Sequence, residues 1–376
     1  MPATEDAATA VAAFVAYEAR ALEELAHCAS AISPSLHSLL PEIADRLSTQ
    51  LAAARANGAF LSQMLEDMDL LDAPSEESAS DAPPPSGDEA AEAAQADVNG
   101  VLLQLRREWS EDGAEERHQS FGPILEALAR FLPSDHWSAA DRGAAGGAAA
   151  GGGTAAAGVG TERRVRVLLP GSGLGRLVFE AAMRGYEALG VESSFCMLLG
   201  AHYVMRTLVP GAREATIHPF AHQGLANCRS ASDRCRPVTV PGLPGAGAVP
   251  VPPPARLRLA SRAFESLAAE PHHAGAWDAV LTAFFIDACP DVAQACEQVF
   301  AVLRPGGVWI NHGPLLYHGK RGGPRLTSDE LMLLLGRLGF EVLEQAFRPC
   351  VYSQDDTSMC RSEYTCLYYA VRKRDV

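Results

Sequence analysis

The chain has 376 residues, 48% of them hydrophobic, so it can bury a sizeable core, and its length predicts two or three domains. A formal charge of −15 argues against a nucleic-acid partner, because binding to phosphates needs a basic face. No apolar stretch is long enough to predict a membrane span, and no basic leader predicts secretion. The nine cysteines lack the spacing of zinc sites, so we expect reduced thiols, no metal site and a cytoplasmic or nuclear location.

The N-terminal region is predicted to be helical. Apolar residues recur at helical spacing through residues 8–70, interrupted at Pro34 and Pro41, which indicates two or three helices packed as a hairpin. We assign residues 1–72 to this region, which either caps the main domain or gates its substrate. Residues 73–97 are rich in Ala, Ser, Pro, Asp and Glu and are predicted to form a disordered acidic linker.

Residues 98–376 are predicted to form one α/β domain with a doubly wound, mostly parallel Rossmann-like sheet. Low-complexity stretches near 143–160 and 230–254 are expected to loop out of the folded frame and to carry no chemistry. A helical segment over 98–132 comes first. The strands that follow are predicted at 165–169, at a run ending at Glu192, and at 257–260, 279–286, 308–311, 340–343 and 364–371, with helices at 177–184, 194–208, 292–303 and 328–338 and a turn at 304–307.

A glycine-rich turn, Pro170-Gly-Ser-Gly-Leu-Gly-Arg-Leu-Val178, joins the first predicted strand to a helix. This arrangement lets backbone N–H groups and a helix N-terminus approach a nucleotide closely, and glycine is needed because a Cβ would block the approach. The next strand ends at Glu192, 21 residues after Gly171, where a carboxylate can reach ribose hydroxyls. The pair indicates a nucleotide-type cofactor, either NAD or S-adenosylmethionine (SAM).

Two later segments favour SAM. Residues 277–281 (WDAVL) resemble the fourth strand of many SAM-dependent methyltransferases, whose C-terminal end faces the reacting methyl group. Residues 303–307 (LRPGG), followed by an apolar strand, resemble a turn in the second half of the same enzymes. Together with the glycine turn and the acidic residue, in this order, they favour a class I SAM-dependent methyltransferase over an NAD-dependent oxidoreductase.

Five longer segments together resemble the carnosine N-methyltransferase family. They are residues 104–111 (QLRREWSE), 170–177 (PGSGLGRL), 284–287 (FFID), 309–318 (WINHGPLLYH) and 356–359 (DTSM). The likeness covers nearly the whole chain apart from the three low-complexity stretches. It implies transfer of a methyl group from SAM to an imidazole nitrogen of carnosine (β-alanyl-histidine), giving anserine.

The resemblance implies that Asp287, His318 and Tyr364 contact the substrate. An imidazole nucleophile needs its reacting nitrogen unprotonated and in line with the methyl group, and a partner at the other ring nitrogen. Asp287, at the end of a predicted buried strand, is suited to accept that N–H and to stabilise the positive charge that develops on the ring, and His318 is suited to hold the ring or relay its proton. Alternatively, Asp287 caps the helix that follows, and His318 is a structural histidine.

The cofactor residues are also assigned by the resemblance. Gly171 would lie against the amino-acid portion of SAM, and Glu192 would bind the ribose hydroxyls. Gln104 and Arg107 lie one helical turn apart, so both can reach one site, and in the family such a pair helps to close over SAM; the alternative is a solvated helix face. The full set that we assign to SAM is Gln104, Arg107, Gly171, Glu192, Ala263, Phe264 and Ala283.

The chain departs from the family pattern at two places. Ala263 replaces an acidic residue that precedes the phenylalanine near the adenine, so a contact to the adenine amino group is missing or comes from elsewhere. Ser362 and Glu363 stand where the family tends to have tyrosines, and Glu363 is suited to bind an amino group or to change substrate preference.

We therefore predict a SAM-dependent N-methyltransferase that acts on a small histidine-containing dipeptide, with a homodimer as an open possibility. One alternative is a methyltransferase for a peptidyl histidine or another small molecule. The other is a catalytically silent SAM-binding interaction protein.

Overall fold

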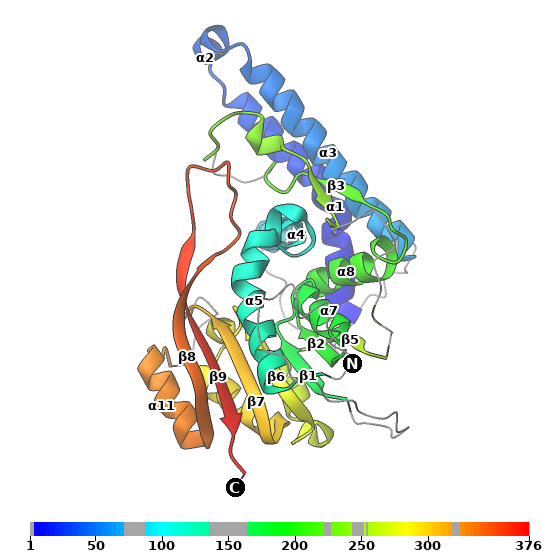
Figure 1. Cartoon of the computed structure of the whole chain (residues 1–376). Helices are drawn as coiled ribbons and strands as arrows, with labels where there is room; N and C mark the ends of the chain where they lie inside the picture. The colour runs from blue at the N-terminus through cyan, green and yellow to red at the C-terminus, as the bar shows by residue number, and fades with distance from the viewer. Residues whose placement is uncertain are drawn as a thin grey trace, which may run out of the picture.

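The computed structural model describes residues 4–70, 87–134, 164–221, 227–242, 252, 255–317 and 324–375. Within these residues a seven-stranded sheet forms the centre of the molecule (Figure 1), in the order β5-β2-β1-β6-β7-β9-β8. Its strands are β1 (Arg166–Pro170), β2 (Glu187–Glu192), β5 (Leu257–Ser261), β6 (Trp277–Ala283), β7 (Leu303–Gly313), β8 (Phe340–Val351) and β9 (Glu363–Lys373); β3 (Ala215–Ile217) and β4 (Val238–Val240) pair separately.

The described helices fall into an N-terminal group and a group that follows the strands. The first group is α1 (Thr4–Ser30), α2 (Pro34–Leu39), α3 (Ile43–Asp67), α4 (Gly87–Trp109), the 3₁₀ turn η1 (Glu111–Gly113) and α5 (Ala114–Phe131). The second group is α7 (Arg176–Met183), α8 (Phe195–Tyr203) with its π-helical continuation η2 (Val204–Leu208), η3 (Asp233–Cys235), α9 (Phe264–Ala268), η4 (Pro271–His273), η5 (Ile286–Ala288), α10 (Val292–Val302) and α11 (Ser328–Leu338).

The strand order places a binding crevice at one end of the sheet. Strands β5, β2, β1, β6 and β7 are parallel, and β9 pairs antiparallel with both β7 and β8. Because β1 lies between β2 and β6, the chain winds outward in opposite directions from this point. Such a reversal leaves a crevice at the carboxyl ends of the strands, where ligands bind in open α/β sheets. The order confirms the predicted doubly wound Rossmann-like fold.

Helices cover both faces of the sheet, as the alternation of side chains along β1 shows. Val167 and Leu169 belong to the core cluster that contains residues of α5 and α7, whereas Leu168 belongs to the cluster with residues of α9, α10 and α11. A parallel strand covered on both faces is expected to be apolar throughout, and the last four residues of β1 are all buried. The continuous apolar run in the sequence therefore reflects a central position in the sheet.

The N-terminal helices form the predicted hairpin, and its base is part of the main core. Helices α1 and α3 lie side by side, with α2 at the far tip (Figure 1). Phe14 and Tyr17 of α1 are buried in the same apolar cluster as Leu102 of α4 and Leu199 of α8. The hairpin is consequently anchored on the helices that cover one edge of the sheet.

Two segments that we expected outside the folded frame are part of it. Helix α4 begins at Gly87, so residues 87–97 of the predicted linker are helical, because a run of Ala, Glu and Gln has high helix propensity. Strand β4 lies within the predicted 230–254 insertion, and both of its valines are buried. The composition of the whole stretch hid this short alternating pattern. The stretches 143–160 and 73–86 lie outside the described residues.

Two strands differ in extent from those predicted. Strand β6 ends at Ala283, three residues early, because Phe284 takes a positive φ of 52° and the chain turns into η5. Asp287 therefore lies in a 3₁₀ turn and not at the end of the strand itself. Strand β7 includes the predicted turn at 304–307, where its pairing with β6 shifts register.

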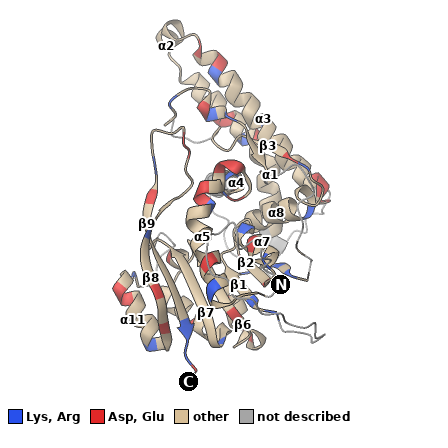
Figure 2. Ribbon diagram, in the orientation of Figure 1, with Lys and Arg blue, Asp and Glu red and all other residues tan. Residues whose placement is uncertain are grey.

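Charged residues of both signs are interspersed over the helices and the sheet (Figure 2). Acidic residues are in excess, with 46 Asp and Glu against 31 Lys and Arg. Among the residues that the structure describes, no helix is both long and apolar enough to cross a membrane. In this view the charged residues gather on no single group of helices or strands.

Candidate functional site

A cavity of about 650 Å³ lies at the carboxyl ends of β1, β2 and β6; we call it the large cavity. Gly171 follows β1, Glu192 ends β2 and Ala283 ends β6, so three strands deliver these residues to one place. All seven residues assigned to a cofactor from the sequence line it, namely Gln104, Arg107, Gly171, Glu192, Ala263, Phe264 and Ala283. The structure brings the complete set together.

The glycine turn forms one wall of the large cavity, and two of its glycines have no room for a side chain. Gly171 has φ +63°, and a Cβ there would lie 2.4 Å from Cδ2 of Phe285. Gly173 has φ +54°, and a Cβ there would lie 2.8 Å from Oε1 of Glu108. Both conformations are ones that residues with a Cβ rarely adopt. The turn therefore presents bare backbone to the cavity.

Glu192 connects this turn to the next helix. Its Oε2 accepts the N–H of Gly173 at 2.9 Å, and its Oε1 accepts those of Ser193 and Ser194 at 2.8 and 2.9 Å. Ser194 is in turn the N-cap of α8. Because a carboxylate has about four acceptor positions, three backbone donors leave room for one more donor, such as a hydroxyl group.

Gln104 and Arg107 face the interior, which overturns the alternative of a solvated helix face. The Arg107 side chain is only 7% exposed, and its guanidinium lies 4.8 Å from the centre of the Tyr352 ring. Nε2 of Gln104 donates to the Tyr352 hydroxyl at 3.0 Å, and its Oε1 accepts from Nη1 of Arg107 at 3.3 Å. Tyr352, which the sequence did not identify, is thus held by both residues of the pair.

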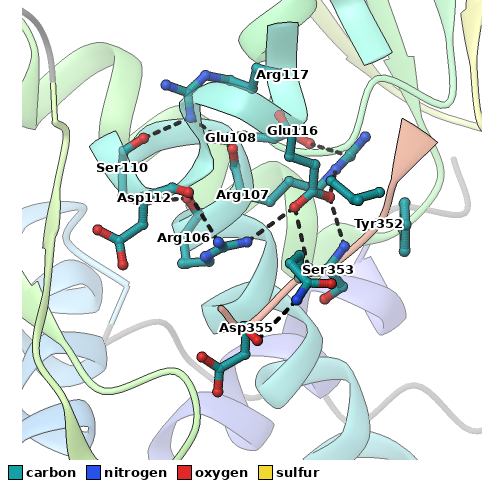
Figure 3. A network of polar contacts seen from close by, with 12 residues as sticks. Arg106, Arg107, Glu108, Ser110, Asp112, Glu116, Arg117, Tyr352, Ser353 and Asp355 are labelled. Carbon is teal, nitrogen blue, oxygen red and sulfur yellow. Dashed lines mark hydrogen bonds and ion pairs between the residues drawn. The ribbon is translucent and has the colours of Figure 1, made fainter. Parts of the chain in front are cut away.

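A buried carboxylate, Glu116, joins the three segments of this network (Figure 3). Its Oε1 accepts from Nε of Arg107 at 2.8 Å and from the backbone N–H of Ser353 at 2.7 Å, and its Oε2 accepts from Nη1 of Arg106 at 3.0 Å. Buried charges need such partners, because a lone one would pay its full desolvation cost. Glu116 on α5 therefore fixes α4 relative to the segment that carries Tyr352.

Glu108 is a second residue that the sequence analysis missed, although it lies within the quoted QLRREWSE segment. It is 4% exposed, and its Oε2 accepts the N–H of Arg176, the first residue of α7, at 3.1 Å. Burial raises the pKa of the Glu108 carboxyl above its usual value. Glu108 thus holds the end of the glycine turn through the first N–H of α7. Only the packing of α4 against α7 reveals this contact, because the two helices are distant in the sequence.

A smaller cavity of about 240 Å³ adjoins the first; we call it the small cavity. It is lined by Phe284, Asp287, Pro314, Leu316, Tyr352 and Tyr364, and it shares Phe284 and Tyr352 with the large cavity. Two of the three predicted substrate residues, Asp287 and Tyr364, therefore meet here. The third, His318, lies outside the described residues.

Asp287 is 1% exposed, and its Oδ2 accepts the backbone N–H of Leu316 at 3.1 Å. The alternative role as a helix cap is wrong. Asp291 caps α10 instead, by accepting the N–H groups of Ala293 and Gln294 at 2.8 and 3.1 Å. Asp287 is therefore a buried carboxylate in the wall of a cavity, tied to the segment that follows β7.

Three aromatic rings surround the junction of the two cavities. The centre of the Phe284 ring lies 4.7 Å from that of Tyr352 and 6.2 Å from that of Tyr364, and the two tyrosine rings are 6.3 Å apart. The positive φ of Phe284 is strained for a residue with a side chain, and strain of this kind clusters at functional sites. A backbone hydrogen bond of 3.0 Å from Phe284 to the carbonyl of His312 holds it in place.

His312, which accepts this bond, is fully buried on β7. Its Nδ1 contacts the carbonyl oxygen of Ser120 at 3.2 Å, which fixes Nδ1 as the protonated nitrogen. Burial lowers the pKa of His312 to about 4, so the ring is neutral near pH 7. The backbone carbonyl of His312 thus holds Phe284, whereas its ring joins β7 to α5.

The two departures from the family pattern lie in different surroundings. Ala263 lines the large cavity beside Phe264, and Arg262 and Glu265 on either side of this pair line it as well. Two charged side chains, Arg262 and Glu265, thus lie close to Ala263, the position at which the family has an acidic residue. Glu363 is 48% exposed and pairs with Arg361 at 2.9 Å, and it is not among the residues that line the small cavity.

Comparison with known proteins gives one consistent result. A family model described as carnosine N-methyltransferase matches residues 156–375. Mouse carnosine N-methyltransferase is 29% identical over 281 residues, which cover 73% of this chain and 62% of that protein. The Dictyostelium discoideum protein of the same name is 31% identical over 277 residues, which cover 73% of this chain and 54% of that protein. The chain thus spans between about half and two thirds of these relatives.

Solved structures align more weakly. A SAM-dependent methyltransferase from Methanosarcina mazei is 14% identical, with a TM-score of 0.36 over 57% of this chain and 94% of its own. The fold assignment therefore rests on the strand order of this chain itself.

Proposed function

The chain belongs to the carnosine N-methyltransferase family, and we propose that it transfers the methyl group of SAM to an imidazole nitrogen of a histidine-containing dipeptide such as carnosine, giving anserine. The observation that carries this proposal is the junction of two cavities across Phe284 and Tyr352. Methyl transfer requires the donor and the acceptor to meet in line at a separation of about 3–3.5 Å, and two cavities that share lining residues would let ligands in each of them meet at the junction.

The residues of the large cavity fit SAM. Its volume of about 650 Å³ lies within the range of small-molecule sites, roughly 300–1,000 Å³. The bare backbone at Gly171 and Gly173 leaves room for the amino-acid portion, and Glu192 has an acceptor position left for a ribose hydroxyl. Phe264 offers an apolar surface to the adenine. SAM supplies a methyl group on a positively charged sulfur, which makes that group reactive toward a nitrogen lone pair.

The residues of the small cavity fit an imidazole. The rings of Phe284, Tyr352 and Tyr364 can hold a flat aromatic group between them, and they stabilise positive charge on it. Asp287 would accept the N–H of the non-reacting ring nitrogen and so present the lone pair of the other nitrogen to the methyl group.

Methyl transfer leaves a positive charge on the imidazole ring, and Asp287 would lie beside that charge. The nitrogen lone pair forms the new N–CH₃ bond, the methyl–sulfur bond breaks, and its electrons remain on sulfur. The ring becomes a methylated imidazolium, next to the Asp287 carboxylate, which stabilises it and can take its remaining ring proton. His318, next in sequence to Tyr317, is proposed from the family resemblance to hold the substrate or relay this proton.

Transfer of labelled methyl from SAM to carnosine, homocarnosine and short histidine peptides tests the proposal. Transfer to the dipeptides in preference to the peptides is the expected result. Preference for peptides would show that the substrate is a peptidyl histidine instead. SAM binding in calorimetry without transfer to any imidazole would favour the alternative of a catalytically silent SAM-binding interaction protein. Fractionation and light scattering test the remaining parts of the proposal, a cytoplasmic or nuclear location and assembly as a homodimer.

A further inference from the structure

Glu270, His272 and His273 form a cluster of metal-binding side chains outside both cavities. The cluster lies between α9, whose first residue lines the large cavity, and the start of β6. One ligand atom from each of the three residues lies within 4.8 Å of the other two. We propose that this cluster binds a zinc ion through two imidazole nitrogens and one carboxylate oxygen, with the fourth position open to water.

The spacing of the ligand atoms supports zinc. Oε2 of Glu270 lies 3.4 Å from Nε2 of His272 and 3.6 Å from Nε2 of His273. These separations exceed those of good hydrogen bonds, which are about 2.7–3.2 Å. They match the edges of a tetrahedral zinc site, because zinc–nitrogen and zinc–oxygen bonds of about 2.0–2.2 Å place neighbouring ligands roughly 3.3–3.6 Å apart.

The two ring nitrogens of His273 have different surroundings. Its Nδ1 has no hydrogen-bond partner among the described residues, whereas its Nε2 lies 3.6 Å from Oε2 of Glu270. The ring therefore directs Nε2 at the carboxylate oxygen with which it would share the ion.

The surroundings hold the cluster in place and leave it accessible. Arg262 binds the other oxygen of Glu270, so Oε2 remains for the metal and the carboxylate is oriented as outer-shell groups orient metal ligands. The His273 ring stacks on Trp277 at 5.8 Å between ring centres, and its backbone N–H bonds to the carbonyl of Glu270 at 3.0 Å. The His272 side chain is 71% exposed, which gives the ion a path from solvent and leaves the fourth position to water.

The test is calorimetric titration of Zn²⁺ into the full chain after EDTA treatment. The exposed thiols Cys28 and Cys360 are replaced by serine in every sample, so that surface thiolates do not contribute. We expect one saturable equivalent of Zn²⁺. His272→Ala, an exposed position, and Glu270→Gln should each weaken the affinity at least tenfold. His37→Ala, another exposed histidine, should leave it unchanged.

A second measurement identifies the ligands. The Co²⁺ form should show the absorption of a four-coordinate site without a thiolate charge-transfer band, because nitrogen and oxygen ligate the ion. Circular dichroism confirms that each variant is folded. The proposal is overturned if Zn²⁺ binding does not saturate, if both ligand variants bind as the parent does, or if Co²⁺ shows thiolate ligation. None of these readouts depends on methyl transfer.

Discussion

The large cavity takes much of its wall from short segments that each follow a parallel strand, whereas the small cavity is closed by segments that are far apart in the chain. Gly171, Glu192 and Ala283 reach the large cavity because the carboxyl ends of β1, β2 and β6 lie side by side. Tyr352 and Tyr364, by contrast, come from the end regions of the antiparallel β8–β9 pair. The wall of the large cavity thus depends mainly on the sheet, and the wall of the small cavity depends on how a distant hairpin packs.

Removing the charge of Asp287 should have the largest effect on activity. It should change methyl transfer at the small cavity without changing SAM binding in the large cavity. In Asp287→Asn the amide retains the hydrogen bond to Leu316 but no longer offsets the positive charge on the ring. We expect methyl transfer to carnosine to fall about 10³-fold, with the SAM affinity unchanged. Kinetics and calorimetry measure the two quantities. Asp291→Asn is the matched control, because asparagine caps a helix as well as aspartate. Activity within threefold of the parent would remove Asp287 from the reaction.

Acid should destabilise the folded chain at the buried ring of His312 on β7. The pKa of His312 is lowered from 6.5 to about 4 in the folded chain, so the unfolded chain binds the proton more tightly between these values. The free energy of unfolding is therefore highest above pH 6.5. It decreases as the pH falls toward 4, by on the order of 3 kcal/mol in total.

Urea unfolding at pH 7 and pH 5 measures this loss, about 2 kcal/mol of which should fall in that interval. His312→Gln should remove that part of the pH dependence. His118→Gln, at an exposed position on α5, is the control and should retain it. An equal pH dependence in the His312 variant and the parent would show that the ring does not act in this way.

Glu192→Gln should affect the large cavity alone. The amide cannot accept from all three backbone N–H groups as the carboxylate does, and it loses the charge that strengthens these bonds. We expect SAM to bind about tenfold more weakly, with the KM for the dipeptide within twofold of the parent. Calorimetry and steady-state kinetics measure the pair. Glu187→Gln, at the other end of β2, controls for the loss of charge. A change in dipeptide KM alone would contradict the ribose role.

Tyr352→Phe should have the smallest effect, and this effect should be seen in the affinities of both cavities for their ligands. It removes the hydrogen bond from Gln104 but keeps the ring that both cavities share. The loss of one such bond is worth about 1 kcal/mol, or roughly fivefold in the apparent affinity of each ligand. Gln104→Ala also removes the bond from Arg107, so its loss should be larger, and the double variant should add little to it, because the Gln104–Tyr352 bond is already absent. Fully additive effects would show that they act separately.

Local patterns in the sequence predicted the parts of the site that depend on one strand and its turn. Gly171 and Glu192 were found because a strand, a glycine turn and a carboxylate at the next strand end occur within one short stretch. Asp287 was expected at the end of a strand but lies in a 3₁₀ turn, because the positive φ of Phe284 ends β6 early. Glu108 was quoted within a motif, but its contact with α7 depends on packing that no spacing reveals.

The sequence by itself determined the fold class, because strands that alternate with helices specify a mostly parallel, doubly wound sheet. The family resemblance, carried by five short segments, assigned the residues that line the large cavity. Only the tertiary structure decided how the two cavities meet. The bond between Gln104 and Tyr352 joins residues 248 positions apart, and the Glu116 carboxylate reaches Ser353 across 237 positions. Such contacts exist only after helices and hairpin have packed, because burial and orientation select the partners.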